Sequence, residues 1–121
     1  MQIKVSELSG IALDWAVAKA EGFEPGTHKW GGDDGEGFEL ICNPIWMDNH
    51  IWSPSTDWSQ GGSLIERESI AIMVITNIWQ AVHPSEIDWM AGPTPLIAAM
   101  RCYVASKLGD AVDVPDELME D

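Results

Sequence analysis

The chain has 121 residues and a mass of 13.3 kDa, the size of one compact domain. Its 20 acidic and 6 basic residues give a net charge of −14, so binding to a nucleic-acid backbone or to an anionic membrane surface is not expected. Seven tryptophans and a hydrophobic fraction of 45% supply enough apolar surface for a core, which argues against a wholly disordered chain.

No export or membrane signal is visible in the sequence. The first residues contain no apolar segment of the secretory type, and we expect a cytoplasmic protein. The longest uncharged run, residues 69–85, is interrupted by polar residues and a proline, so we do not expect it to span a bilayer. Cys42 and Cys102 form no CxxC motif, and we expect both to be reduced thiols in the core.

The first predicted elements are a short strand or extended arm and a helix. Ile3 and Val5 alternate with polar neighbours, as in a strand. A serine cap at Ser6 and a glycine stop at Gly22 predict a helix over residues 7–21. Its apolar residues recur at helical spacing and form one stripe: Leu8, Ile11, Ala12, Trp15 and Ala16.

Residues 22–37 are rich in glycine and show no periodicity, which predicts a loop. Apolar runs follow at 38–42, 45–47 and 50–52. The last two runs are separated by Asp48 and Asn49, both of which tolerate a positive φ, so we predict a hairpin with a two-residue turn.

The middle of the chain is predicted to be an antiparallel meander of about four strands. Residues 53–58 have the composition of a turn, and Ser63 is predicted to cap a short helix over 64–68. The β-branched run at 70–75 is predicted to be a strand buried on both faces. Its partner strand is residues 78–82, after a turn at Thr76 and Asn77.

The last predicted helix covers residues 95–108. Thr94 is expected to cap it, Pro95 suits its first position, and Gly109 its end. The acidic residues 110–121 are expected to fray, apart from Val112 and Val114. The predicted fold class is α+β, with two main helices packed on a small antiparallel β-meander of about four strands, a single domain over 1–109 and an acidic C-terminal tail over 110–121.

We find no catalytic or metal-binding pattern in the sequence. His28, His50 and His83 lack the spacing of metal ligands, and the acidic residues at 33–36 lack the alternating ligands of a calcium loop. The sequence points to no base that would activate either cysteine. We therefore predict a protein without enzymatic activity, cofactor or metal.

The most distinctive polar cluster is a turn between two tryptophans. Aromatic rings beside a few polar groups occur in small-molecule pockets and in protein-binding hot spots, and a purely structural turn is the alternative. Arg101 is expected to pair with Asp57 or Glu66, or else to hold an anionic ligand. The candidate ligand- or partner-binding residues are Trp52, Ser55, Asp57, Trp58, Arg67 and Arg101.

Three blocks of sequence resemble the NinX family, small proteins of tailed phages and prophages of enteric bacteria. They are KVSELSG followed by ALDWAVAKAEG within 4–22, SPSTDW with GG and LIERE within 53–68, and GPTPLIAAMRCYVASKLG at 92–109. The resemblance implies a phage-encoded protein that acts in the host bacterial cytoplasm. It implies no enzymatic role and no catalytic residues.

These observations lead us to expect a phage accessory protein that binds, without catalysis, a host component and inhibits a defence or regulatory protein. The expected partner is a host bacterial protein with a basic surface. An ordered acidic face on this chain would compete for that surface. In the alternative interpretation, the negative charge only keeps the protein soluble. The rival function is that of a small-ligand binder, a sponge for a nucleotide-like signal. The oligomeric state stays open, with a homodimer as one alternative.

Overall fold

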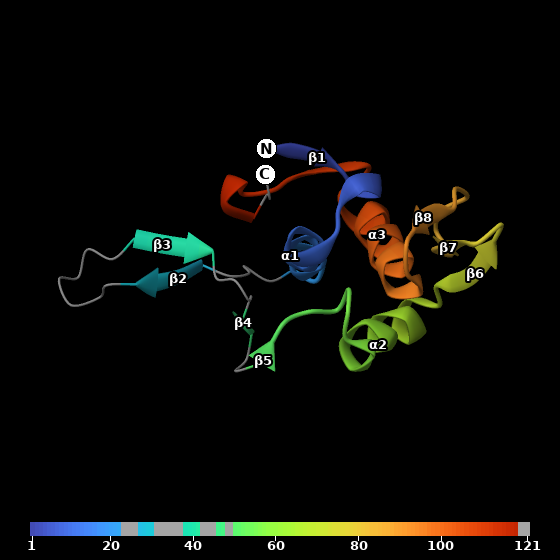
Figure 1. Ribbon diagram of the computed structural model, residues 1–121, viewed down its shortest axis with the longest axis horizontal. Helices are drawn as coiled ribbons and strands as arrows, with labels where there is room; N and C mark the ends of the chain where they lie inside the picture. Colours follow the sequence, from blue (N-terminus) through green and yellow to red (C-terminus); the bar gives the residue numbers. More distant parts are fainter. Residues whose placement is uncertain (23–26, 31–37, 42–45, 48–49, 119–121) are drawn as a thin grey trace.

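A computed structural model describes the backbone of residues 1–22, 27–30, 38–41, 46–47 and 50–118, and the side chains of 1–22, 52–116 and 118. The fold is mixed α+β, as predicted. Helix α3 (Pro95–Leu108) lies at the centre and contacts α1 (Gly10–Ala20), α2 (Trp58–Glu68) and a sheet of β6 (Ala71–Ile75), β7 (Ile78–Val82) and β8 (Met90–Gly92) (Figure 1). None of the described helices is long and apolar enough to cross a membrane.

Helix α1 begins later than predicted. Residues Val5–Glu7 form a short 3-10 helix, η1, and the backbone is extended at Leu8 and Ser9 before α1 starts at Gly10. The predicted start at Ser6 was therefore wrong, whereas the end before Gly22 is confirmed. The buried face also differs from the predicted stripe, because Leu13, Asp14 and Val17 are enclosed with Ala12 and Ala16, whereas Ile11 and Trp15 are only partly buried.

Two small hairpins follow α1. Strand β2 (Thr27–Trp30) pairs antiparallel with β3 (Phe38–Ile41), so residues 27–30 are not the predicted loop. The predicted hairpin is confirmed by the pairing of β4 (Trp46–Met47) with β5 (His50–Ile51). The predicted turn at 48–49, the acidic residues 33–36 and Cys42 lie outside the described residues.

Helix α2 is longer than predicted because it begins at Trp58 rather than after Ser63. The side chain of Asp57 accepts a 2.8 Å hydrogen bond from the backbone N–H of Ser59 and caps the helix. Gly61 lies within the helix, where a Cβ would be 2.3 Å from the carbonyl oxygen of Pro54. The glycine therefore permits the turn at 53–56 to pack directly on α2.

The sheet of β6, β7 and β8 has three strands instead of the predicted four. Thr76 and Asn77 connect β6 to β7 with φ values of 53° and 67°, as a tight hairpin turn requires. Strand β8 was not predicted; it has only three residues and pairs with β7. A Cβ at Gly92 would be 2.6 Å from the backbone nitrogen of Ala98, so β8 lies directly against α3.

Helix α3 agrees with its prediction in start and end. Thr94 caps it by accepting a 3.1 Å hydrogen bond from the N–H of Ile97, and Gly109 follows its last residue. Met100, Tyr103 and Val104 are fully enclosed among side chains from α1 and the sheet. Burial of these side chains contributes to the hydrophobic stabilisation of the fold.

The C-terminal segment is part of the fold as far as Leu118, so the prediction that it frays was wrong for these residues. Strand β9 (Ala111–Asp113) pairs antiparallel with β1 (Gln2–Lys4), and a 3-10 helix, η3 (Asp116–Leu118), follows. Val112, Val114 and Leu118 are buried. These three apolar residues anchor the segment although its other side chains are mostly acidic.

Candidate protein-binding surface

Two of the predicted site residues, Trp52 and Ser55, attach their turn to α1. The indole Nε1 of Trp52 donates to the carbonyl oxygen of Asp14 at 2.9 Å, and the backbone N–H of Ser55 donates to Asp14 Oδ1 at 2.8 Å. The Ser55 hydroxyl is buried, with no hydrogen-bond partner among the described residues. The Trp52 indole and the Ser55 backbone amide are thus engaged in contacts inside the protein.

Asp14 is a buried carboxyl that the sequence-based prediction missed. Burial raises its pKa to about 6, and the hydrogen bond from the Ser55 backbone offsets part of that effect. The available signal was a single acid within the apolar run ALDWAVA, where most neighbouring side chains are buried in the core.

Trp58 and Arg101 do not lie at one common site. Trp58, 56% exposed, lines a shallow hollow of about 230 Å³ at the start of α3. Arg101 lines a separate hollow of about 320 Å³ beside Asn77 and Ile78. A ligand that stacks on Trp58 and pairs with Arg101 at the same time is therefore not favoured.

The expected ion pair of Arg101 with Asp57 or Glu66 is wrong. Arg101 Nε donates to the carbonyl oxygen of Leu8 at 2.7 Å, and Nη1 donates to that of Ala91 at 2.9 Å. Desolvation lowers the pKa of this guanidinium, which nevertheless stays charged. Its role in the fold is to connect the segment before α1 to β8.

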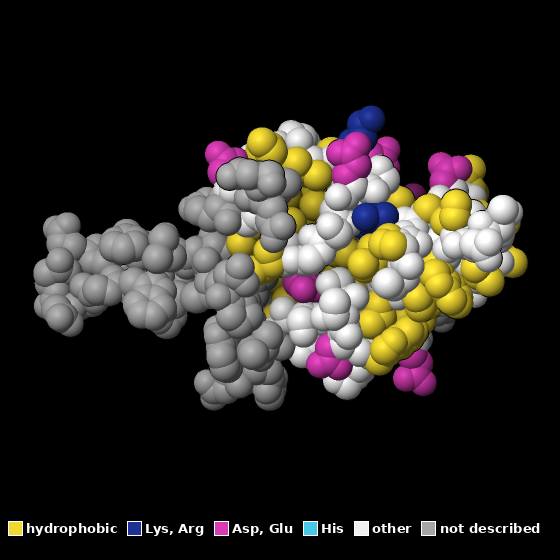
Figure 2. Space-filling model, in the orientation of Figure 1, with side chains coloured by type: hydrophobic (Ala, Val, Ile, Leu, Met, Phe, Trp, Pro, Cys, Tyr) yellow, Lys and Arg dark blue, Asp and Glu magenta, His cyan; other side chains and the backbone are white. Residues whose placement is uncertain are grey.

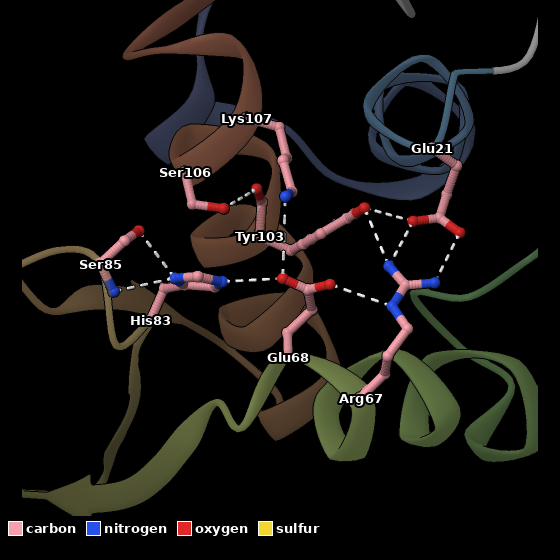
Figure 3. A network of polar contacts seen from close by, with 8 residues as sticks. All are labelled: Glu21, Arg67, Glu68, His83, Ser85, Tyr103, Ser106 and Lys107. Carbon is pink, nitrogen blue, oxygen red and sulfur yellow. Dashed lines mark hydrogen bonds and ion pairs between the residues drawn. The ribbon is translucent and has the colours of Figure 1, made fainter.

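Arg67, another predicted site residue, is the centre of a polar network that joins α1, α2 and α3 (Figure 3). Its guanidinium makes a bidentate pair with Glu21 at 3.0 and 2.6 Å, and Nε donates to Glu68 at 3.0 Å. The Tyr103 hydroxyl donates to Glu21 and accepts from Arg67 Nη2. Lys107 lies 3.9 Å from Glu68.

The network keeps its two carboxylates ionised. The hydrogen bonds from Arg67 lower the pKa of Glu21, and those from His83 and then Arg67 lower the pKa of Glu68. Burial, followed by the neighbouring Glu21, raises the pKa of the Tyr103 hydroxyl. The sequence analysis named Arg67 but none of its partners. Glu21 and Tyr103 are far from it in sequence, whereas Glu68 is its neighbour in α2.

His83, Ser85 and Glu68 have the connectivity of a catalytic triad within this network. His83 Nε2 lies 2.9 Å from Glu68, and its Nδ1 lies 2.8 Å from the Ser85 hydroxyl. The backbone N–H of Ser85 also donates to Nδ1, at 3.0 Å, so the single lone pair of that nitrogen is already engaged. The arrangement closes the turn after β7 and leaves the imidazole poorly placed to activate the hydroxyl as a nucleophile.

The strongest candidate for a binding surface is the face of the β6–β7–β8 sheet that points away from α3. Strand alternation and the pairing register place Ile72, Ala81 and Met90 on the face toward the core. The opposite face, here called the outer face, carries no charged side chain. It consists of Ala71, Met73, Ile75, Ile78, Gln80, Val82 and Ala91.

The outer face is open rather than covered by a second layer. Met73 is 45% exposed and Ile78 49%, and Ile75 is similarly accessible. In Figure 2, hydrophobic side chains gather over the part of the molecule where Figure 1 labels β6, β7 and β8. The prediction that residues 70–75 are buried on both faces was therefore wrong. The run has enough apolar residues for two buried faces, but α3 packs on one face and the outer face stays exposed.

The family model described as Bacteriophage P22, NinX matches residues 4–107. The chain belongs to the NinX family. No curated protein gives a significant match. The matched range of this NinX family member includes the whole β6–β7–β8 sheet, whereas β9 and η3 lie beyond it.

The described part of this NinX family member contains no group of three or more side chains suited to a metal ion. Cys102 is a free, buried thiol, as predicted, and burial raises its pKa to about 12. A thiol in that state is a poor nucleophile. The outer face, with its exposed and uncharged side chains, is therefore the candidate binding surface.

Proposed function

We propose that this NinX family member is a phage accessory protein that acts in the host cytoplasm, without catalysis, by binding a bacterial protein and inhibiting it. A host defence or regulatory protein is the expected target class. The observation that carries the proposal is the uncharged outer face of the β6–β7–β8 sheet in a chain of net charge −14.

The outer face is a contiguous patch rather than a set of scattered apolar residues. Cross-strand pairing joins Ile75 to Ile78 and places Met73 opposite Gln80. Contiguous apolar patches on soluble proteins commonly mark interaction sites, since each Å² removed from water contributes about 25 cal/mol. A protein partner with an apolar centre suits this flat surface better than a small molecule, which needs a concave site.

The charge of the protein adds selectivity to that apolar contact. Exposed acids such as Glu86 and Asp88 lie in the connection between β7 and β8, next to the sheet. An apolar centre with a carboxylate rim favours a partner whose apolar patch is bordered by Lys and Arg. Long-range attraction then accelerates association and makes it sensitive to salt.

The test is a binding experiment with immobilised wild-type protein, Ile78→Lys and Leu108→Lys in host lysate. Ile78 lies on the outer face, and Leu108 is an exposed apolar residue at the end of α3, away from the sheet. We expect a host protein that binds the wild type and Leu108→Lys but not Ile78→Lys. The purified pair should then associate more weakly as salt is raised.

Circular dichroism and thermal melting of the three proteins exclude unfolding as the reason for a loss of binding. Equal capture by Ile78→Lys and the wild type would reject the outer face as the binding surface. Absence of any captured protein at low salt across several hosts would reject host-protein binding altogether.

A further inference from the structure

We propose that two copies of this protein associate through the free edge of β6, forming a continuous six-stranded antiparallel sheet. Strand β6 is the end strand of the order β6-β7-β8, so β7 is its one hydrogen-bonded neighbour among the described strands. This inference concerns the strand edge and does not depend on the proposed function of the outer face.

The free edge of β6 has unused hydrogen-bonding capacity. In an antiparallel ladder every second residue directs its N–H and C=O away from the neighbouring strand. Among the described residues, no side chain or backbone group from outside the hairpin bonds to β6. A row of such groups is a template for pairing with another strand.

Strand β6 also lacks the features that usually prevent edge pairing. Its sequence, AIMVI, contains no lysine, no other charge and no proline, and its five residues pair in unbroken register with β7. The other edge of the sheet is different. Strand β8 has three residues, is followed by Pro93, and has its Ala91 carbonyl oxygen engaged by Arg101.

Electrostatics identify a second copy as the occupant of the β6 edge. Two molecules of charge −14 repel each other wherever their carboxylates approach. Residues 70–82, which comprise β6, its turn and β7, contain no charged residue. Here the chain can meet its own copy without bringing like charges into contact.

The sequence of β6 is also suited to pairing with itself. A two-fold axis at Met73 places Ile72 opposite Val74 of the partner subunit and Ala71 opposite Ile75 of the partner subunit. Pairs of β-branched residues across strands are favourable. This register keeps each outer-face residue opposite another one, so the apolar outer faces of the two copies become continuous.

The first experiment measures mass against concentration by sedimentation, for the wild type, Val74→Lys and Leu108→Lys. We expect a monomer–dimer equilibrium in the wild type and in Leu108→Lys, and a monomer for Val74→Lys. Added salt should strengthen the dimer, because it screens the repulsion between like-charged copies. The proposed host complex should instead weaken as salt is added. The salt dependence of each complex therefore tests one proposal without deciding the other.

The second experiment tests the register under mild oxidation, with cysteines introduced one at a time beside the native Cys42 and Cys102. Edge pairing places residue 73 next to its copy at about 4.5–5.5 Å between Cα atoms, within reach of a disulfide. Met73→Cys should therefore give covalent dimer, whereas Ile78→Cys, on the central strand, should remain at the wild-type level. Cross-linking of both variants would indicate face-to-face packing and overturn the proposal, as would a wild-type monomer at all concentrations.

Discussion

The carboxylate of Asp14 in α1 accepts a 2.8 Å hydrogen bond from the backbone amide of Ser55, 41 residues further along the chain. The contact joins α1 to the turn that precedes α2, and it is enclosed by the core. Because a charged carboxylate is poorly solvated there, this contact makes the stability of the protein depend on pH.

Asp14→Asn is expected to stabilise the protein at pH 7. The folded-state pKa of about 6 lies above the ordinary value of 3.8, so between these values the folded protein binds more protons than the unfolded chain. This group therefore lowers the free energy of unfolding as pH rises through that window, by about 2–3 kcal/mol in total. The asparagine keeps an acceptor for the Ser55 amide and does not ionise.

Urea unfolding of the wild type and Asp14→Asn at several pH values between 4 and 7 measures this effect. The difference in the free energy of unfolding should grow in favour of the variant as pH rises. Asp88→Asn, the same substitution at an exposed position, serves as the matched control. A constant difference between wild type and Asp14→Asn would contradict the raised pKa.

The adjacent glycines of α2 are expected to respond oppositely to alanine. A Cβ at Gly61 would be 2.3 Å from the Pro54 carbonyl oxygen, so Gly61→Ala should lower the free energy of unfolding by about 2–3 kcal/mol. At Gly62 the nearest atom would be 3.6 Å away, and Gly62→Ala should stabilise by about 0.5–1 kcal/mol. Thermal melting that shows both variants shifted in the same direction would disprove this packing.

Arg67→Met is expected to lower stability at neutral pH and to matter less in acid. The arginine lowers the pKa of Glu21, so its contribution is present above the ordinary carboxylate pKa and is lost as pH falls through the lowered folded-state value. Because the Arg67 side chain is half exposed, we expect about 1 kcal/mol at pH 7. Unfolding of the wild type and Arg67→Met at neutral and at strongly acidic pH tests this. A difference in their free energies of unfolding that does not change with pH would refute it.

Arg101→Lys is expected to destabilise the protein although the charge is kept. The guanidinium spans the carbonyl oxygens of Leu8 and Ala91, whereas a lysine ammonium is a single point of donation that cannot reproduce the planar fork. We expect a loss of about 1–2 kcal/mol in chemical unfolding, and a larger one for Arg101→Met. Wild-type stability in both variants would show that neither hydrogen bond stabilises the fold.

Elements whose signals are local could be predicted from the sequence. Helix α3 follows from the cap at Thr94 and the stop at Gly109, and the β6–β7 hairpin follows from Thr76 and Asn77. In these cases residues adjacent in sequence satisfy each other's backbone groups, so no knowledge of the rest of the fold is required.

Elements that depend on distant partners were mispredicted or missed. Ser63 and Asp57 are both suitable caps, and the choice of Asp57 depends on the packing of Gly61 against Pro54. Strand β8 is too short to show periodicity in its sequence. Strand β9 forms because it pairs with β1 and because Val112 is buried in the core. Of the predicted site residues, Trp52, Arg67 and Arg101 make hydrogen bonds within the fold. The outer face, by contrast, follows from the strand register and from which face α3 covers.

The pairing of β1 with β9 has a consequence for synthesis of the protein on the ribosome. Strand β1 is translated before its hydrogen-bonding partner, residues 111–113, which emerges only after α1, α2 and α3 have been made. The backbone N–H of the buried residue Val5 donates to the carbonyl oxygen of Asp110, so this hydrogen bond also forms only after α3 has been made. A nascent chain therefore exposes its N-terminal segment until residues 111–113 have emerged, and full protection of that segment from proteases is expected only after that point.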